Sequence, residues 1–186
     1  MNANDQPDPA PIRRTREVLA YGNRFVQIFD DEVQFPDGSA GRYLRIEGAA
    51  EGHGVVVIPV HGDEVGLVRT FRYPVGQFQW AFPRGFAHSP DPLVTAAAEL
   101  HEELGAAATE MEIAGSFTPD SGMLAQQIVV VVAQVTDTNT TPIDVGEVSG
   151  VRWLSLAELW SDVADGRLTD GMTLAALTLA RARKLI

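Results

Sequence analysis

The 186-residue sequence has no cysteine, and this absence excludes several kinds of site at once. Disulfides, zinc–thiolate centres and thiol nucleophiles all need the cysteine sulfur. The sequence also has no apolar run near the ~18 residues of a membrane-spanning helix, and residues 1–11 lack the apolar core of a signal peptide. We therefore expect a cytoplasmic protein that does not enter a membrane.

Positive charge is scarce, and Lys184 is the only lysine. Against 14 Lys and Arg residues stand 25 Asp and Glu residues, which gives a formal net charge of -11. This balance argues against sequence-independent binding of nucleic acid, which depends on basic patches that neutralise phosphates. An acidic protein that handles phosphate-rich small molecules usually needs a metal cation to mediate the contact.

The chain is long enough for one domain with a real core, and 45% of its residues are hydrophobic. Residues 1–12 combine prolines with polar residues and are typical of a disordered tail. Residues 13–48 are rich in β-prone residues around the turn signal Pro36-Asp37-Gly38, so we expect N-terminal strands there. Residues 49–186 form the expected main domain.

Within the main domain, continuous apolar runs predict buried strands, and capping signals predict helices. The expected strands cover residues 55–60, 65–71, 128–135 and 151–154. The expected helices cover 92–104 and 170–184, with a shorter one starting at Ser155, whose partner Glu158 completes a capping box. Many strands with few helices favour an α/β protein with a mixed sheet covered by helices.

The helix expected at 92–104 carries three glutamates, Glu99, Glu102 and Glu103, on one face. At ~100° per residue they lie roughly opposite an apolar stripe, which consists of Leu93, Ala97, Leu100 and Leu104. One interpretation is a solvated acidic face. The other is a magnesium site, because no lysine or arginine on this helix offsets the mutual repulsion of the carboxylates and a hard dication would.

The segment before this helix, Trp80–Gly85, ends in a Pro-Arg-Gly turn. Together with Glu99-Leu100-His101-Glu102-Glu103-Leu104-Gly105, it resembles the Nudix hydrolase box, in which Gly85, the three glutamates, Gly105 and Ala106 match the pattern. The resemblance covers roughly residues 42–165. It implies a Nudix α/β/α sandwich with a mixed sheet. It also implies that Glu99, Glu102 and Glu103 hold Mg²⁺, with Mn²⁺ as an alternative ion.

The sequence departs from the family pattern at three places. Ala98 replaces the arginine that braces the glutamates in the family, and the loop after Gly85 is one residue shorter. Ala81 replaces a glutamate that often serves as an additional metal ligand. Arg84 is our candidate for orienting Glu99 in place of the missing arginine. Lost supporting residues of this kind commonly lower metal affinity or activity 10- to 100-fold.

The segment Val68–Gly76 followed by Trp80–Gly85 resembles the ADP-ribose and ADP-sugar pyrophosphatase branch of the family. The resemblance implies a substrate loop around Ser121 and Gly122. Arg72 and Arg84 offer forked donors that suit phosphate oxygens, with Gly85 as a neighbouring substrate contact, although an arginine in a strand-end turn can instead be simply solvated. The resemblance implies Glu147 as the general base, with Glu103 as the other catalytic candidate, although Glu147 is equally readable as an ordinary loop acid. It also implies a homodimer formed through the N-terminal strands.

Aromatic residues before the box are open to two interpretations. They could stack on a nucleobase, but aromatic residues in strands more often belong to the core. The residues concerned are Phe71, Tyr73, Phe78 and Trp80.

The leading functional hypothesis is Mg²⁺-dependent hydrolysis of a nucleoside diphosphate derivative, with ADP-ribose or an ADP-sugar as first choice. A second hypothesis is a weak or inactive Nudix domain that binds such a nucleotide as a sensor or scaffold. The third is a pyrophosphohydrolase of nucleoside triphosphates or dinucleoside polyphosphates. Retention of all three glutamates favours an enzyme, whereas the losses at Ala81 and Ala98 favour a binding protein.

Overall fold

The computed structural model describes residues 10–49, 51–87 and 89–186. It divides into two compact units, which are described separately below. The first unit comprises residues 1–50 and 120–125, and the second comprises residues 51–119 and 126–186. Most of the tail predicted at 1–12, as far as residue 9, lies outside the described residues.

The first unit contains an antiparallel sheet in which every other strand pairs with β3. Its strands are β1 (Arg13–Arg16), β2 (Leu19–Gly22), β3 (Val26–Gln34) and β4 (Ala40–Gly48). The predicted turn joins β3 to β4, with the amide of Gly38 donating to the carbonyl of Phe35 at 2.9 Å. Gly38 has a φ of +85°, a conformation that glycine adopts without a steric penalty. The segment 120–125 pairs with β4 through two backbone hydrogen bonds of Ile46.

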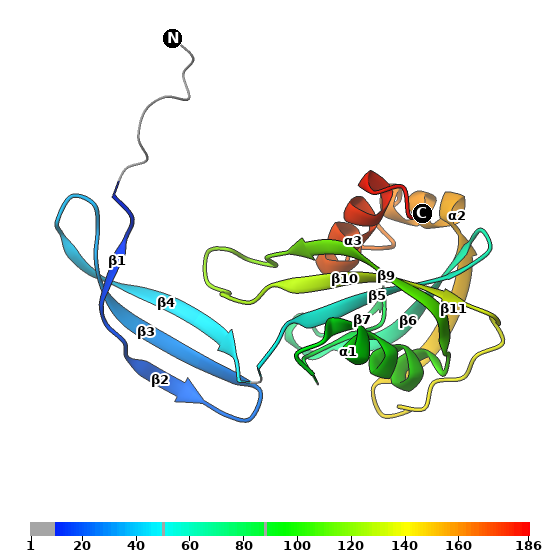
Figure 1. Cartoon of the computed structure of the whole chain (residues 1–186), viewed down its shortest axis with the longest axis horizontal. Coiled ribbons are helices and arrows are strands. Elements are labelled where there is room, and N and C mark those ends of the chain that lie inside the picture. Colours follow the sequence, from blue (N-terminus) through cyan, green and yellow to red (C-terminus); the bar gives the residue numbers. More distant parts are fainter. Residues whose placement is uncertain (1–9, 50, 88) are drawn as a thin grey trace, which may run out of the picture. The chain divides into compact units, whose positions relative to one another are not determined.

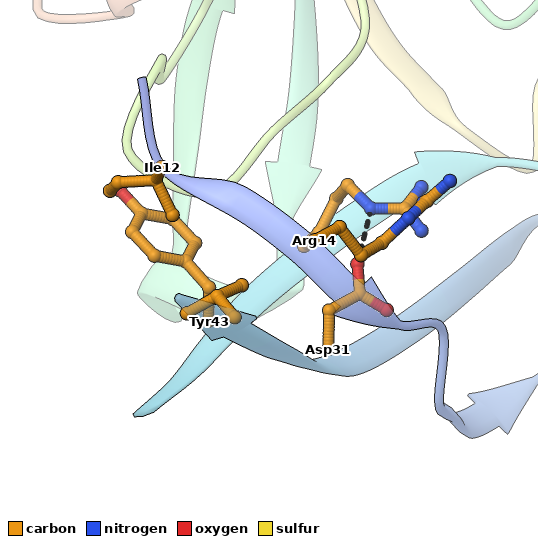
Figure 2. Close-up of a pocket in the computed structure, with 6 residues that line it drawn as sticks. Ile12, Arg14, Asp31 and Tyr43 are labelled. Atoms are coloured by element: carbon orange, nitrogen blue, oxygen red, sulfur yellow. Dashed lines mark hydrogen bonds and ion pairs between the residues drawn. The ribbon is translucent and has the colours of Figure 1, made fainter. Parts of the chain in front are cut away.

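A pocket of about 430 Å³ lies on this sheet. Figure 2 shows Ile12 and Tyr43 on one side of it and Arg14 and Asp31 on the other. Asp31 is 3% exposed, and its carboxylate accepts a hydrogen bond from Arg45 Nε at 2.9 Å. Asp31 is therefore a buried charge compensated inside the unit, and its ion pair fixes the strands that line the pocket.

The second unit is built on a seven-stranded mixed sheet with the main order β11-β6-β5-β10-β9, in which β7 also pairs with β6 and β8 with β5. Its strands are β5 (Gly54–His61), β6 (Glu64–Arg72), β7 (Gln77–Ala81), β8 (Arg84–Gly85), β9 (Ala108–Phe117), β10 (Ile128–Val135) and β11 (Val148–Ser155). The strands β5 and β10 are parallel and buried along nearly their whole length. Their continuous apolar sequences follow from burial on both faces.

Helices cover both faces of this sheet (Figure 1). On one face, α1 (Pro92–Glu99) packs Ala96 against the odd-numbered valines of β5, Val55 and Val57. On the other face, α2 (Leu156–Ala164) and α3 (Gly171–Ala182) pack against Val56 and Ile58. The predicted α/β/α sandwich with a mixed sheet is confirmed. No helix in the described part of the chain is long and apolar enough to cross a membrane.

The helix predicted at 92–104 is interrupted after α1 by a π-helical turn, η2 (Leu100–Leu104). The predicted apolar face was right for Leu100 and Leu104, which are buried, and for Leu93, which packs against them. It was wrong for Ala97 and for two of the glutamates. Ala97, expected in the core, is exposed, while Glu99 and Glu103 are each only 6% exposed and lie on the side that packs against the sheet. Glu102 is exposed. The apolar pattern alone misplaced the buried face because its centre is occupied by two carboxylates.

Candidate functional site

The backbone of β8 lies directly beside the two buried glutamates. A Cβ atom built on Gly85 would stand 1.9 Å from Oε1 of Glu99, so only glycine leaves room for this carboxylate. The amide of the preceding residue, Arg84, donates to Oε2 of Glu103 at 3.0 Å. Gly85 and Arg84 therefore set the positions of both carboxylates by close contact and by a charge-assisted hydrogen bond.

Burial makes both carboxylates weak acids. It is the main cause that raises the pKa of Glu99 to about 7, and the charges of Glu102, Glu147 and Asp144 add to the effect. Burial also raises the pKa of Glu103 to about 7, against the opposing influence of the Arg84 amide and with a further increase from Glu99. The site thus concentrates negative charge that the protein compensates only in part.

The loop before β11 brings two further carboxylates to this cluster. The amides of Ile143 and Asp144 both donate to the carbonyl of Glu102 at 2.9 Å. A Cβ on Gly105, whose φ is +69°, would stand 1.9 Å from the carbonyl oxygen of Thr141. The loop is therefore tied to the end of η2, and the exposed Glu147 follows at the start of β11.

Two arginines, Arg72 and Arg84, lie within electrostatic reach of the Glu103 carboxylate. Arg72 ends β6, and within the described residues its buried Nε and Nη2 atoms have no hydrogen-bond partner. Burial and then the neighbouring charge of Arg84 lower the pKa of Arg72, while Asp170, Glu103 and Glu147 oppose this shift. Arg84 is neutralised differently, because its Nη1 lies 2.8 Å from both carboxylate oxygens of Asp170. Of these two arginines, Arg72 is the one whose buried donors lack a hydrogen-bond partner among the described residues.

Most of the predicted site residues meet in the second unit, at the ends of β6 and β8 and the start of β11. They are Arg72, Arg84, Gly85, Glu99, Glu102, Glu103 and Glu147. Ser121 and Gly122 belong to the first unit, where the Gly122 amide donates to Asp120 at 2.8 Å, so their predicted place in the substrate site stays a prediction.

The aromatic residues before the box divide into two groups. Trp80 packs against the core and lies under the guanidinium of Arg152 at 5.0 Å. Phe71 and Phe78 contact each other edge-on with ring centroids 5.2 Å apart, and each is 48% exposed. Tyr73 is almost fully exposed. Trp80 therefore has a structural role, whereas the other three rings are accessible.

The carboxylates of the cluster are compared here with the oxygen ligands that a metal ion needs. Among the residues that the structure describes, no three Asp, Glu or His side chains are grouped as a ready-made metal site. The chemistry of the cluster nevertheless fits a hard dication, because Glu99 and Glu103 offer carboxylate oxygens, and the neighbouring carboxylates add to the effect of burial in raising the pKa of Glu99.

The comparison with known protein families agrees with this arrangement. The family model for the NUDIX domain matches residues 51–175, which is two thirds of the chain. The chain belongs to the Nudix family. The predicted resemblance is confirmed, and the protein is a Nudix hydrolase.

Curated relatives and a solved structure extend the comparison. The chain is 26% identical over 175 residues to the CMP-5'-(N-acetyl-N-hydroxy-3-aminopropyl)phosphonate hydrolase of Streptomyces rubellomurinus (strain ATCC 31215), covering 90% of this chain and 83% of the relative. It is 26% identical over 162 residues to the methanol dehydrogenase activator of Bacillus methanolicus, covering 84% and 85%. A crystal structure of an ADP compounds hydrolase has the same fold, with a TM-score of 0.81, 18% identity, and coverage of 95% and 96%.

The Nudix box of this chain lacks its usual arginine, and the structure gives Arg84 a different role from the expected one. Ala98 is half-buried on α1. The hydrogen bonds of Arg84 among the described residues go to Glu103 and Asp170, rather than to Glu99 as expected. The close contact with Glu99 comes from Gly85.

Sequence reasoning missed Asp170 as part of this Nudix site. Its only signal was local, because an Asp three residues before Thr173 is typical of a helix N-cap. Its contact with Arg84 joins residues 86 positions apart, and no short motif reports such a distance.

Proposed function

We propose that the chain hydrolyses the diphosphate linkage of a nucleoside diphosphate derivative, with ADP-ribose or an ADP-sugar as first choice. The observation that carries this proposal is the juxtaposition of buried carboxylates with the unpartnered donors of Arg72. A magnesium diphosphate suits both groups, since the cation suits the carboxylates and the phosphate oxygens suit the guanidinium of Arg72.

Glu99, Glu102 and Glu103 are the residues that we propose to hold Mg²⁺ or Mn²⁺. A bound divalent ion neutralises the charge that develops on the phosphate leaving oxygen. The raised pKa values of Glu99 and Glu103 make these two carboxylates hold a proton more readily when no cation is present, so metal binding should release protons near neutral pH.

Arg72 is the residue that we propose to bind a phosphate oxygen of the substrate. Its Nε and Nη2 form two donors of one planar fork, which matches a phosphate in bidentate geometry. Arg84 adds positive charge beside the proposed phosphate position, while its Nη1 stays hydrogen-bonded to Asp170. Gly85 contributes by leaving the space for Glu99, and Ser121 and Gly122 remain our candidates for contacts to the distal part of the substrate.

Glu147 is our proposed general base. Its charge influences Glu99 and Arg72, so it lies within electrostatic reach of both the carboxylates and the guanidinium. Because Glu147 is exposed, it can accept a proton from an attacking water without the large cost of burying its charge. Glu103, Asp120 and Asp144 are the alternatives, and Glu103 is also the one with a pKa near the working pH.

The substrate class has support from what similar proteins are named for. One relative is named as a hydrolase of a CMP-linked phosphonate, and the structural neighbour is titled an ADP compounds hydrolase. Both names describe a nucleotide joined to a second group. We therefore rank nucleoside diphosphate derivatives above nucleoside triphosphates and dinucleoside polyphosphates.

A binding protein without turnover is the second candidate. Ala98 and Ala81 remove two side chains that could have supported the metal, so a nucleotide could be held without rapid hydrolysis. Retention of Glu99 and Glu103 in a buried cluster favours the enzyme, because two buried carboxylates lower stability without a cation and a binding protein has no need of them.

The deciding experiment is a phosphate-release screen over ADP-ribose, nucleotide sugars, nucleoside triphosphates and dinucleoside polyphosphates with Mg²⁺ and Mn²⁺. Calorimetric titration of Mn²⁺ into the parent, Glu102→Gln and Glu103→Gln should accompany it. We expect hydrolysis of a diphosphate-linked substrate and loss of most Mn²⁺ binding in both variants. Tight nucleotide binding without hydrolysis would favour the sensor, and unchanged metal binding in both variants would leave the glutamates without a metal role.

We also propose that the protein is a cytoplasmic homodimer that associates through the first unit. The strands of this unit expose large apolar side chains, among them Leu19 at 56%, Tyr21 at 55% and Leu44 at 46%. Exposed apolar strands favour association with a partner chain. Sedimentation equilibrium should give twice the 20.1 kDa chain mass, and Leu19→Asp combined with Leu44→Asp should give the monomer mass.

A further inference from the structure

The start of α3 forms a buried network of three hydrogen-bonding groups. Asp170 is the N-cap, and its Oδ2 accepts hydrogen bonds from the amide of Thr173 at 2.9 Å and from the Thr173 hydroxyl at 2.8 Å. Both side chains are almost completely buried, at 6% exposure for Asp170 and 1% for Thr173. A helix cap needs only the first of these bonds, so the additional contacts call for another explanation.

The network continues to residues 82–84, which include the Arg84 amide that donates to Glu103. Thr173 Oγ1 accepts a hydrogen bond from the amide of Phe82 at 3.0 Å, and Asp170 holds the Arg84 side chain through Nη1. Between them, the carbonyl of Pro83 accepts from the amide of Val57 at 2.9 Å, on the neighbouring strand β5. Each of the three residues 82–84 is therefore fixed by a separate contact, immediately before β8 turns its Arg84 amide toward Glu103.

Asp170 also neutralises the buried charge of the Arg84 guanidinium. The side chains of Arg84 and Asp170 are 17% and 7% exposed, so removing either charge leaves the other buried and poorly compensated. Arg72 and Glu103 lie within electrostatic reach of this pair. Without Asp170, the Arg84 guanidinium would be drawn to the carboxylates of the cluster and would compete there with a cation.

We propose that Asp170 and Thr173 are positioning residues of the hydrolytic site, holding residues 82–84 so that the Arg84 amide stays on the Glu103 carboxylate. They also keep the Arg84 charge paired, which leaves Arg72 as the guanidinium open to substrate phosphate. This inference rests on the proposed function for its metal and substrate. The residues act through Arg84 and touch neither the substrate nor the ion.

The experiment compares Thr173→Val, which is isosteric but lacks the hydroxyl, with Thr173→Ser, which keeps it. Asp170→Asn is the second test variant, because asparagine caps a helix as well as aspartate does. Asp162→Asn is the matched control: Asp162 on α2 is also buried, at 7% exposure, and also bonds arginines, but these are Arg152 and Arg167 and not Arg84. The readouts are Mn²⁺ affinity by calorimetry, hydrogen exchange of the Arg84 amide, and kcat and KM.

We expect Thr173→Val and Asp170→Asn to weaken Mn²⁺ binding about tenfold, in the range for residues that orient metal ligands, and to accelerate exchange of the Arg84 amide. Turnover should fall more than KM rises. Thr173→Ser should retain the parent values, and Asp162→Asn should lower the melting temperature without changing Mn²⁺ affinity.

Parent-like Mn²⁺ affinity in both test variants would overturn the positioning role, as would equal losses in Asp162→Asn, which would indicate general destabilisation. If Thr173→Val does not fold, Asp170→Asn decides the question. If the parent binds Mn²⁺ but hydrolyses no nucleotide, the proposed function fails while the metal comparison still tests the inference. If the parent binds no Mn²⁺, exchange of the Arg84 amide decides, and an unchanged rate in the test variants refutes the inference.

Discussion

Replacing Glu103 with glutamine should stabilise the metal-free protein at alkaline pH. The substitution keeps the size of the side chain, and the amide oxygen of glutamine can still accept the hydrogen bond from the Arg84 amide. The substitution removes a negative charge from a side chain that is almost completely buried, since Glu103 is only 6% exposed. Buried charge without a full partner lowers stability, so its removal is favourable until a cation is added.

The pH dependence gives the sign and the size of this effect. The pKa of Glu103 rises from 4.5 in the unfolded chain to about 7 in the folded protein, so the folded state binds the proton more tightly. Stability of the parent therefore falls as the pH rises from about 4.5 to about 7 and then stays level. At ~1.4 kcal/mol for each pH unit, the loss approaches ~3 kcal/mol at pH 8 as an upper limit. Because Glu99 titrates in the same range, we expect glutamine to recover ~1–3 kcal/mol.

Urea unfolding in the presence of EDTA, followed by tryptophan fluorescence at pH 5 and pH 8, measures the effect. Glu103→Gln should exceed the parent in unfolding free energy at pH 8 and differ little from it at pH 5. Glu102→Gln is the control, since Glu102 is exposed. Added Mg²⁺ should stabilise the parent and not Glu103→Gln. A variant that is less stable than the parent at pH 8, or equally stabilised at both pH values, would refute the reasoning.

Four further variants test single contacts of the site. Gly85→Ala should weaken Mn²⁺ binding at least tenfold in calorimetry, because its Cβ would displace the Glu99 carboxylate; parent-like affinity would show that the carboxylate moves freely. Glu147→Gln should lower turnover at least ~100-fold with little change in KM, whereas a loss under threefold would reject it as the base. Arg72→Lys should raise KM about tenfold, since lysine lacks the bidentate fork, and an unchanged KM would contradict its role. Ala98→Arg should raise metal affinity or turnover, and no gain in either would indicate that the glutamates are already well oriented.

The parts of the fold that sequence could predict are those with strong local signals. The strand predicted at 128–135 has those bounds in the structure, because a short apolar run rich in β-branched valine is typical of a strand buried on both faces. The capping box at Ser155 and Glu158 is present with both of its hydrogen bonds. In contrast, β9 was not predicted, since it has no continuous apolar run and only Ala114 of its residues is buried.

The site was predictable where a motif is contiguous and unpredictable where it depends on tertiary contacts. The spacing of Glu99, Glu102 and Glu103 identified the cluster, but hydrophobicity placed two of these carboxylates on the wrong face, because periodicity assumes that charges face water. Their burial follows from the passage of β8 beside α1, which no helical pattern encodes. Likewise, the ion pair of Arg84 with Asp170 depends on two elements that meet only after the sheet has formed.

The parallel pairing of β5 with β10 has a consequence for the order in which the chain folds. Gly54 pairs with Ile128, so the buried, apolar strand β5 has no partner on one edge until a much later segment has been made. At a synthesis rate of roughly 5–20 residues per second, a gap of about 70 residues lasts several seconds. During that interval Val55–Val60 is a valine-rich, uncharged strand with an unpaired edge, and transiently exposed surfaces of this kind are prone to aggregation. Expression at lower temperature or with chaperones should therefore raise the yield of folded protein more than any change at the acidic surface.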